Sequence, residues 1–179
     1  MSDIRTLKVT LPLIQAPPVE VAITGALTAS HGADVSITTT ATAVPFNTND
    51  FDSGGSIDHD TVTNNTRFTV NQSGTYEFIF QPQVASLSNN TGNVYFWVRR
   101  NGTTPIANSA VTYKVNHTAT TNIVTVGIVL PLLANEYVEL IAQASVNGEY
   151  VLDYIAGSGS GATARPATPS AIVSVKGWV

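Results

Sequence analysis

The sequence contains no cysteine and very little charge. None of its 179 residues is Cys, and only 11% are charged, whereas 43% are hydrophobic. The absence of Cys excludes a disulfide framework, a thiolate metal site and a thiol nucleophile. A freely soluble monomer commonly carries about a quarter charged residues. We therefore expect partners to cover much of this protein's surface.

Basic clusters, membrane spans and helical patterns are also missing. The net charge is -4 and the only adjacent basic residues are Arg99 and Arg100, so the charge gives no reason to expect nucleic-acid binding. No apolar run is long enough to predict a membrane span, and residues 1–18 lack the basic start and apolar core of a secretory signal. Helix content should be minimal, because no useful stretch has a 3.6-residue hydrophobic period.

Strand-like alternation is the clearest positive signal. In the stretch from Phe68 to Phe80, aromatic residues occupy every second position after a turn signal at residues 71–74, as Tyr76, Phe78 and Phe80. Side chains two apart share one face of a β-strand. The spacing predicts a strand of an antiparallel sheet that lines the core.

Similar segments recur along the chain at intervals of roughly 8 to 12 residues, which is typical of a sandwich or jelly roll. We predict an all-β jelly-roll sandwich of about ten antiparallel strands. Residues 45–60 are predicted as a loop and residues 157–169, rich in Gly and Ser, as a flexible surface loop. The expected strands are two within 19–44 and one each over 67–70, 74–84, 93–100, 104–115, 121–133, 136–144, 149–156 and 171–179.

The chain divides into an N-terminal arm, residues 1–18, and a head domain, residues 19–179. The arm alternates apolar and polar residues before Pro17 and Pro18, which cannot continue a helix or a central strand. We expect it to lie extended on a partner. Its anchoring side chains are predicted to be Ile4, Leu7, Val9, Leu11 and Leu13. At the other end, the apolar Trp178 and Val179 should complete a sheet or enter a subunit interface.

Acidic residues gather around Gly54 and Gly55. Oxygen-rich loops of this kind can hold Ca²⁺, but the spacing matches no EF-hand, and Asp and Gly also shape ordinary turns. The turn interpretation is favoured, and no metal is expected. The candidate ligands under the calcium alternative are Asp50, Asp52, Asp58 and Asp60.

Catalytic constellations are lacking. His31, His59 and His117 all fall in predicted turns among polar neighbours, where surface histidines are common, and no nucleophile motif accompanies them. The Gly-Ser run over residues 157–161 has no strand-to-helix elbow and no following helix to cradle a phosphate. The sequence therefore predicts a protein that is not an enzyme and has no cofactor.

The segment of aromatic and basic residues over 95–100 has more than one interpretation. Alternation places Tyr95, Trp97 and Arg99 on one face of a strand, and Phe96, Val98 and Arg100 on the other. Packing of the rings in a sheet or a trimer axis is favoured over a nucleic-acid strip. Contact with another partner is the remaining alternative.

Several motifs resemble a known family. Phe68 followed by GTYEFIF at residues 74–80, preceded by Phe46 and Asp52 within PFNTNDFDSGGSID, resembles the signature of the globular head domain of the first complement component, a relative of the tumour-necrosis-factor fold. The later segments GNVYFWVRRNG, ANEYVELIAQAS and SAIVSVKGW follow in the family's order. The resemblance covers roughly residues 20 to 179, and so many spaced positions rarely match by chance.

The resemblance implies a jelly roll that assembles as a homotrimer. The residues expected in the trimer core or interface are Tyr76, Phe78, Phe80, Tyr95, Trp97 and Trp178. The sequence lacks a collagen-like stalk. In this respect it is similar to phage virion heads of the family, which dock by an N-terminal segment. The resemblance thus suggests a capsid decoration, cement or head-fibre protein on the virion surface, with the major capsid protein as partner. The alternative is a receptor- or glycan-binding fibre tip, using loops 89–93, 101–105 and 157–169.

Overall fold

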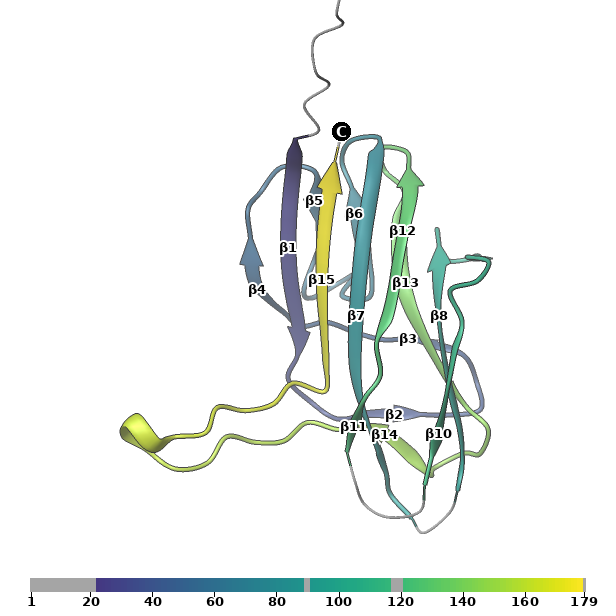
Figure 1. The fold of residues 1–179 in the computed structure, drawn as a ribbon, viewed down its shortest axis with the longest axis vertical. Helices are drawn as coiled ribbons and strands as arrows, with labels where there is room; N and C mark the ends of the chain where they lie inside the picture. The colour runs from purple at the N-terminus through teal and green to yellow at the C-terminus, as the bar shows by residue number, and fades with distance from the viewer. Residues whose placement is uncertain (1–21, 89–90, 117–120, 179) are drawn as a thin grey trace, which may run out of the picture.

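The structure is a computed structural model that describes residues 22–88, 91–116 and 121–178. These residues form two antiparallel β-sheets packed face to face (Figure 1). The one helical element in the described residues is a turn of 3-10 helix, η1 (Gly161–Thr163). No helix in this part of the chain is long and apolar enough to cross a membrane.

The first sheet, called the large sheet, has eight strands in the order β2-β14-β7-β15-β1-β4, with β11 and β12 also paired to β7. β7 is central, because β12 pairs along residues 74–80 and β15 pairs along residues 75–82 of the same strand. The strands are β1 (Ile23–His31), β2 (Val35–Ile37), β4 (Thr48–Asp52), β7 (Gly74–Ser86), β11 (Asn122–Ile123), β12 (Val126–Leu132), β14 (Tyr150–Leu152) and β15 (Ala171–Trp178).

The second sheet, called the small sheet, has seven strands in the order β10-β8-β13-β6-β5. β3 pairs with β13, and β9 pairs with β8. Its strands are β3 (Thr42–Ala43), β5 (Ile57–Asp58), β6 (Phe68–Val70), β8 (Gly92–Arg100), β9 (Thr104–Pro105), β10 (Val111–Val115) and β13 (Tyr137–Ala144).

An aromatic core lies between the sheets. Tyr76, Phe78 and Phe80 of β7 are completely buried, as alternation predicts. Phe68 packs edge-on against Phe46 and Phe80, with ring centroids 5.2 and 6.0 Å apart, an arrangement that aromatic quadrupoles favour. Each such buried side chain stabilises the fold by about 1.5–3 kcal/mol.

A tight turn between β8 and β9 fixes one end of the small sheet. Asn101 and Gly102 both have positive φ, 50° and 74°, and Thr103 donates its N–H to the carbonyl of Arg100 at 3.2 Å. Two consecutive positive φ angles define a type I′ turn, for which Asn-Gly is the preferred pair. A Cβ on Gly102 would also lie 2.7 Å from the Tyr137 hydroxyl, so glycine is required here on two grounds.

Most expected strands are present, and β15 lies between β1 and β7, so the apolar C-terminal segment completes a sheet as predicted. The prediction of a loop over residues 45–60 is wrong, because β4 and β5 lie within it. All residues of β4 are exposed, so this edge strand has no buried alternation that the sequence could reveal. The expected single strands over 104–115 and 121–133 are each divided in two. Residues 1–18, the predicted arm, lie outside the described residues.

Candidate interaction surfaces

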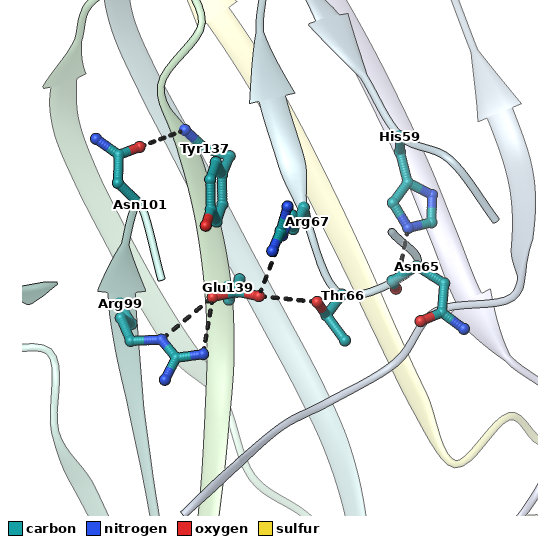
Figure 2. A network of polar contacts seen from close by, with 8 residues as sticks. All are labelled: His59, Asn65, Thr66, Arg67, Arg99, Asn101, Tyr137 and Glu139. Atoms are coloured by element: carbon teal, nitrogen blue, oxygen red, sulfur yellow. Dashed lines mark hydrogen bonds and ion pairs between the residues drawn. The ribbon is translucent and has the colours of Figure 1, made fainter. Parts of the chain in front are cut away.

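Glu139 lies at the centre of a polar network on the outer face of the small sheet (Figure 2). One carboxylate oxygen, Oε2, accepts hydrogen bonds from Nε and Nη2 of Arg99 at 3.2 and 2.9 Å. The other, Oε1, accepts the hydroxyl of Thr66 at 2.8 Å and lies 3.8 Å from Nε of Arg67. The side chain is only 4% exposed. A buried carboxylate with this many charged and polar donors is held in one position.

Strand register explains how the network forms. Glu139 of β13 is paired directly with Arg99 of β8, and its neighbours Val138 and Leu140 point into the core. Alternation therefore directs Glu139 to the outer face, where opposite charges on adjacent strands attract.

Tyr137 and Arg67 extend this network. The guanidinium of Arg67 lies over the Tyr137 ring, 4.5 Å from its centroid, a favourable cation–π arrangement. The backbone of Tyr137 is fixed by Asn101, whose N–H donates to the Tyr137 carbonyl and whose Oδ1 accepts the Tyr137 N–H, both at 3.0 Å. The turn after β8 thus positions the ring.

Two further rings lie along β8 on the same outer face. Tyr95 and Trp97 are partly exposed, whereas Phe96 and Val98 face the core. Trp97 is paired with Ile141 of β13, which is completely buried although it occupies an outward position. We call the group of Tyr95, Trp97, Tyr137, Arg67 and Arg99 the aromatic-arginine face. Exposed rings next to guanidinium groups suit sugars and carboxylate-bearing ligands.

Two of the acidic loop residues form side-chain turns. The Oδ1 of Asp52 accepts the N–H of Gly54 at 2.7 Å, and Oδ1 of Asp60 accepts the N–H of Val62 at 2.8 Å. These are side-chain turns of the expected kind, and the backbone hydrogen bonds lower the pKa of Asp60. Nowhere in the described chain do three acidic, His or Cys side chains converge as ligands would. The hydrogen bonds favour the turn interpretation for Asp52 and Asp60, and the expectation of no metal at Asp50, Asp52, Asp58 and Asp60 stays a prediction.

The prediction of surface histidines is wrong for His31 and His59, since both are buried. His59 is enclosed because its ring packs on Phe68, and its ring nitrogens lie 2.6 Å from Oδ1 of Asn49 and 3.2 Å from the Asn65 carbonyl. Burial lowers the pKa of both histidines. The described chain shows neither ring hydrogen-bonded to a hydroxyl or carboxylate. His117 lies outside the described residues, and the absence of enzyme activity stays a prediction.

A second surface covers the outer face of the large sheet. One row of paired residues crosses four of its strands. Ala26 of β1 is paired with Lys176 of β15, Lys176 with Glu77 of β7, and Glu77 with Val129 of β12. Lys176 and Glu77 are directly paired, so their charges offset each other. We call this surface the apolar sheet face. Its apolar side chains, exposed or partly exposed, are Ile23, Phe51, Ile79, Ile123, Val129, Ile172 and Trp178.

The six residues predicted in a trimer core or interface separate into three places. Tyr76, Phe78 and Phe80 are completely buried within one protomer, so their assignment to contacts between copies is wrong. Tyr95 and Trp97 lie on the aromatic-arginine face, on the opposite side of the sandwich from Trp178, which lies on the apolar sheet face beside Ile23. For these three, intersubunit contact stays a prediction.

Sequence reasoning missed several surface residues. Among them are Phe51, in a segment predicted as a loop, and the network formed by Arg67, Tyr137 and Glu139. Opposite charges at outward positions of two strands were visible signals, but only the pairing register brings them together. The predicted anchoring residues Ile4, Leu7, Val9, Leu11 and Leu13 lie outside the described residues.

Solved structures of other proteins share this fold. The globular domain of zebrafish complement 1qA protein superposes with a TM-score of 0.50, covering 87% of this chain and 96% of that domain at 17% sequence identity. Murine APRIL at pH 5.0 superposes with a TM-score of 0.54, covering 86% of this chain and 98% of its own, at 11% identity. No family profile and no curated protein matches the sequence. The expected fold is thus confirmed: the chain is an all-β, two-sheet antiparallel sandwich of the complement 1q and tumour-necrosis-factor type.

Proposed function

We propose that this protein is a non-enzymatic homotrimeric head on the surface of a virion, where it acts as a capsid decoration, cement or head-fibre protein. The observation that carries the trimer is the apolar sheet face, which exposes Phe51 and Val129 and pairs Lys176 with the oppositely charged Glu77. Large exposed apolar side chains gathered on one face of a sheet favour an interaction site. Domains of this fold usually form homotrimers. In an oligomer with cyclic symmetry, every copy uses the same surface for contact with its neighbours.

The attachment mechanism is multivalent. Each subunit of the trimer carries one N-terminal arm, residues 1–18, whose apolar residues dock on the major capsid protein. Once one arm has bound, the other arms bind as intramolecular events at a high effective concentration. Modest contacts by each arm then give stable attachment.

Light scattering after size exclusion tests the trimer. The unmodified chain should have three times its monomer mass of 18.8 kDa, and Val129→Glu should dissociate the trimer because it places a charge in the contact. Val62→Glu is the matched control, since Val62 is 82% exposed and lies in a loop away from the apolar sheet face. A lone subunit for the unmodified chain would overturn the trimer.

Co-sedimentation with purified coat particles tests the virion role. Deletion of residues 1–18 should leave a folded trimer that no longer sediments with the particles. Sedimentation of the truncated trimer would show that the arm is not the anchor, and failure of the full chain to sediment would oppose the capsid role.

Saccharide recognition is a second candidate function, and the aromatic-arginine face favours it. Partly exposed Trp97 and the Tyr137–Arg67 pair offer ring and guanidinium contacts to a sugar. In a glycan array, selective binding that Trp97→Ala abolishes would support this function. Gln81→Ala is the control, because Gln81 is an exposed residue of β7 on the other sheet. Binding unaffected by Trp97→Ala would exclude this face.

A further inference from the structure

Residues 154–169 form a two-stranded ribbon that projects from the sandwich (Figure 1). Ile155 and Thr168 exchange backbone hydrogen bonds of 3.0 and 2.8 Å, and Ser158 and Arg165 exchange another pair of 3.0 and 2.7 Å. The turn of η1 closes the tip. The segment predicted as a flexible loop is therefore a paired ribbon.

The base of the ribbon is fixed to the end of the large sheet. The N–H of Tyr154 donates to Oδ1 of Asp34 at 2.7 Å. On the returning strand, the buried Ser170 donates its N–H to the His31 carbonyl at 3.0 Å and its hydroxyl to the Ala33 carbonyl at 2.6 Å. These contacts set the direction in which the ribbon leaves the sandwich.

Beyond its base, the ribbon is exposed on all sides. Residues 156–167 are all exposed, and their hydrogen bonds in the described structure join residues of the ribbon to one another. A two-stranded hairpin on its own is marginally stable in water. A paired ribbon whose tip covers none of the described residues of the sandwich is the kind of element that is stabilised by a partner.

The composition of the ribbon indicates which type of contact it can make with a partner. Arg165 is its only charged residue, and the guanidinium donates to the Ala156 carbonyl at 2.6 Å, so it lies back along the ribbon. Pro166 and Pro169 have no N–H, which makes the second strand a poor template for an added strand. Contact through uncharged side chains therefore suits the ribbon better than addition of a strand to its second strand.

We propose that the ribbon binds a second copy of this chain by lying on that copy's apolar sheet face. We call this contact the clasp. The uncharged Ala, Ser, Thr and Pro side chains of the ribbon match the exposed apolar side chains of that face, on which the opposite charges of Lys176 and Glu77 are directly paired. The ribbon also leaves from the ends of β14 and β15, strands of the same large sheet. Association through that face brings each ribbon next to a neighbour, and a head-to-tail contact of this type closes a ring. This inference rests on the proposed homotrimer.

Site-directed photocrosslinking tests the clasp directly. The chain has no Cys, so Ala162→Cys at the tip places a benzophenone label at a single site. Illumination should join two copies, and mass spectrometry should find the cross-link in β4 or β12 of the second copy. Val62→Cys is the control label on an exposed loop and should give few joined copies. Cross-links confined to one chain, including its residues 1–21, or formed with coat protein alone would overturn the clasp.

A ribbon deletion supplies the second test. Replacing residues 156–167 by Gly-Gly connects Ile155 to Thr168, which are already hydrogen-bonded neighbours, and circular dichroism checks that the β fold is kept. The concentration at which the trimer dissociates should rise by roughly tenfold or more. An unmodified chain that is monomeric overturns the trimer itself. A trimer whose dissociation is unchanged by the deletion overturns the clasp alone.

Discussion

The imidazole of His59 stacks on the ring of Phe68, with centroids 4.5 Å apart and planes 12° from parallel. Phe46 and Phe80 enclose Phe68 from other directions, so a titratable ring forms one wall of the aromatic core. The stability of the core is thereby connected to the protonation of His59.

Stability should fall as the pH falls below about 6.5. Burial lowers the pKa of His59 from its ordinary value of 6.5, although Asp60 and Asp58 oppose this shift. The unfolded chain then binds a proton that the folded chain excludes, so stability is complete above the unfolded pKa and is lost on acidification. His31 acts in the same direction. Urea unfolding at pH 8 and pH 5.5 measures the loss, which His59→Gln should reduce. An equal loss in that variant would contradict this role.

Removing Glu139 should destabilise the fold strongly. Glu139→Ala leaves the partly exposed guanidinium of Arg99 without the carboxylate that accepts two of its hydrogen bonds, and hydrogen bonds to charged groups contribute about 1.5–3 kcal/mol. Asp50→Ala, at an exposed acidic residue, should change the free energy of unfolding by less than about 0.5 kcal/mol. Chemical denaturation of both variants measures the difference, and equal effects would show that the network adds nothing.

Truncating Phe68 should also be costly, for a different reason. Phe68→Ala opens a cavity among the rings of Phe46, Phe80 and His59, which typically costs about 3–5 kcal/mol. Val62→Ala, at a largely exposed position, should have almost no effect. Thermal unfolding at fixed protein concentration compares the variants. A loss under about 1 kcal/mol for Phe68→Ala would contradict the described packing.

Removal of the hydroxyl should affect stability differently at Tyr150 and at Tyr76. The hydroxyl of Tyr150 is buried and has no hydrogen-bond partner in the described structure, and burial together with Glu149 raises its pKa. Tyr150→Phe should leave stability unchanged or raise it by up to about 1 kcal/mol. The hydroxyl of Tyr76 donates to the Gln72 carbonyl at 2.8 Å, so Tyr76→Phe should lower stability by about 1 kcal/mol. Urea denaturation measures both, and a destabilising Tyr150→Phe would indicate a partner at that hydroxyl.

The parts of the fold that follow a simple period were predictable. Phe78 and Phe80 revealed the core face of β7, because a residue spacing of two specifies a face without knowledge of the partner strand. On β8 the same rule separated Phe96 and Val98 from Tyr95 and Trp97, but both faces begin apolar, and only the structure shows that Phe96 and Val98 face the core. Alternation assigns residues to faces within a strand.

The surfaces depended on information that alternation does not contain. Phe51 lies in β4, which is stabilised by backbone pairing with β1 and has no buried residues. Glu139 and Arg67 meet only because β13 pairs with both β8 and β6. His59 looked like a surface residue since acidic neighbours flank it, yet its ring turns inward onto Phe68. Register and long-range packing decide these positions.

The position of β15 between β1 and β7 has a consequence for biosynthesis. Until residues 171–178 emerge from the ribosome, β1 and β4 have no connection through the sheet to β7. Nascent chains therefore expose two unjoined halves of the large sheet, with open strand edges that attract other chains. Closure by the final strand should be the slow step of folding, because pairing across such sequence separations carries a large entropic cost.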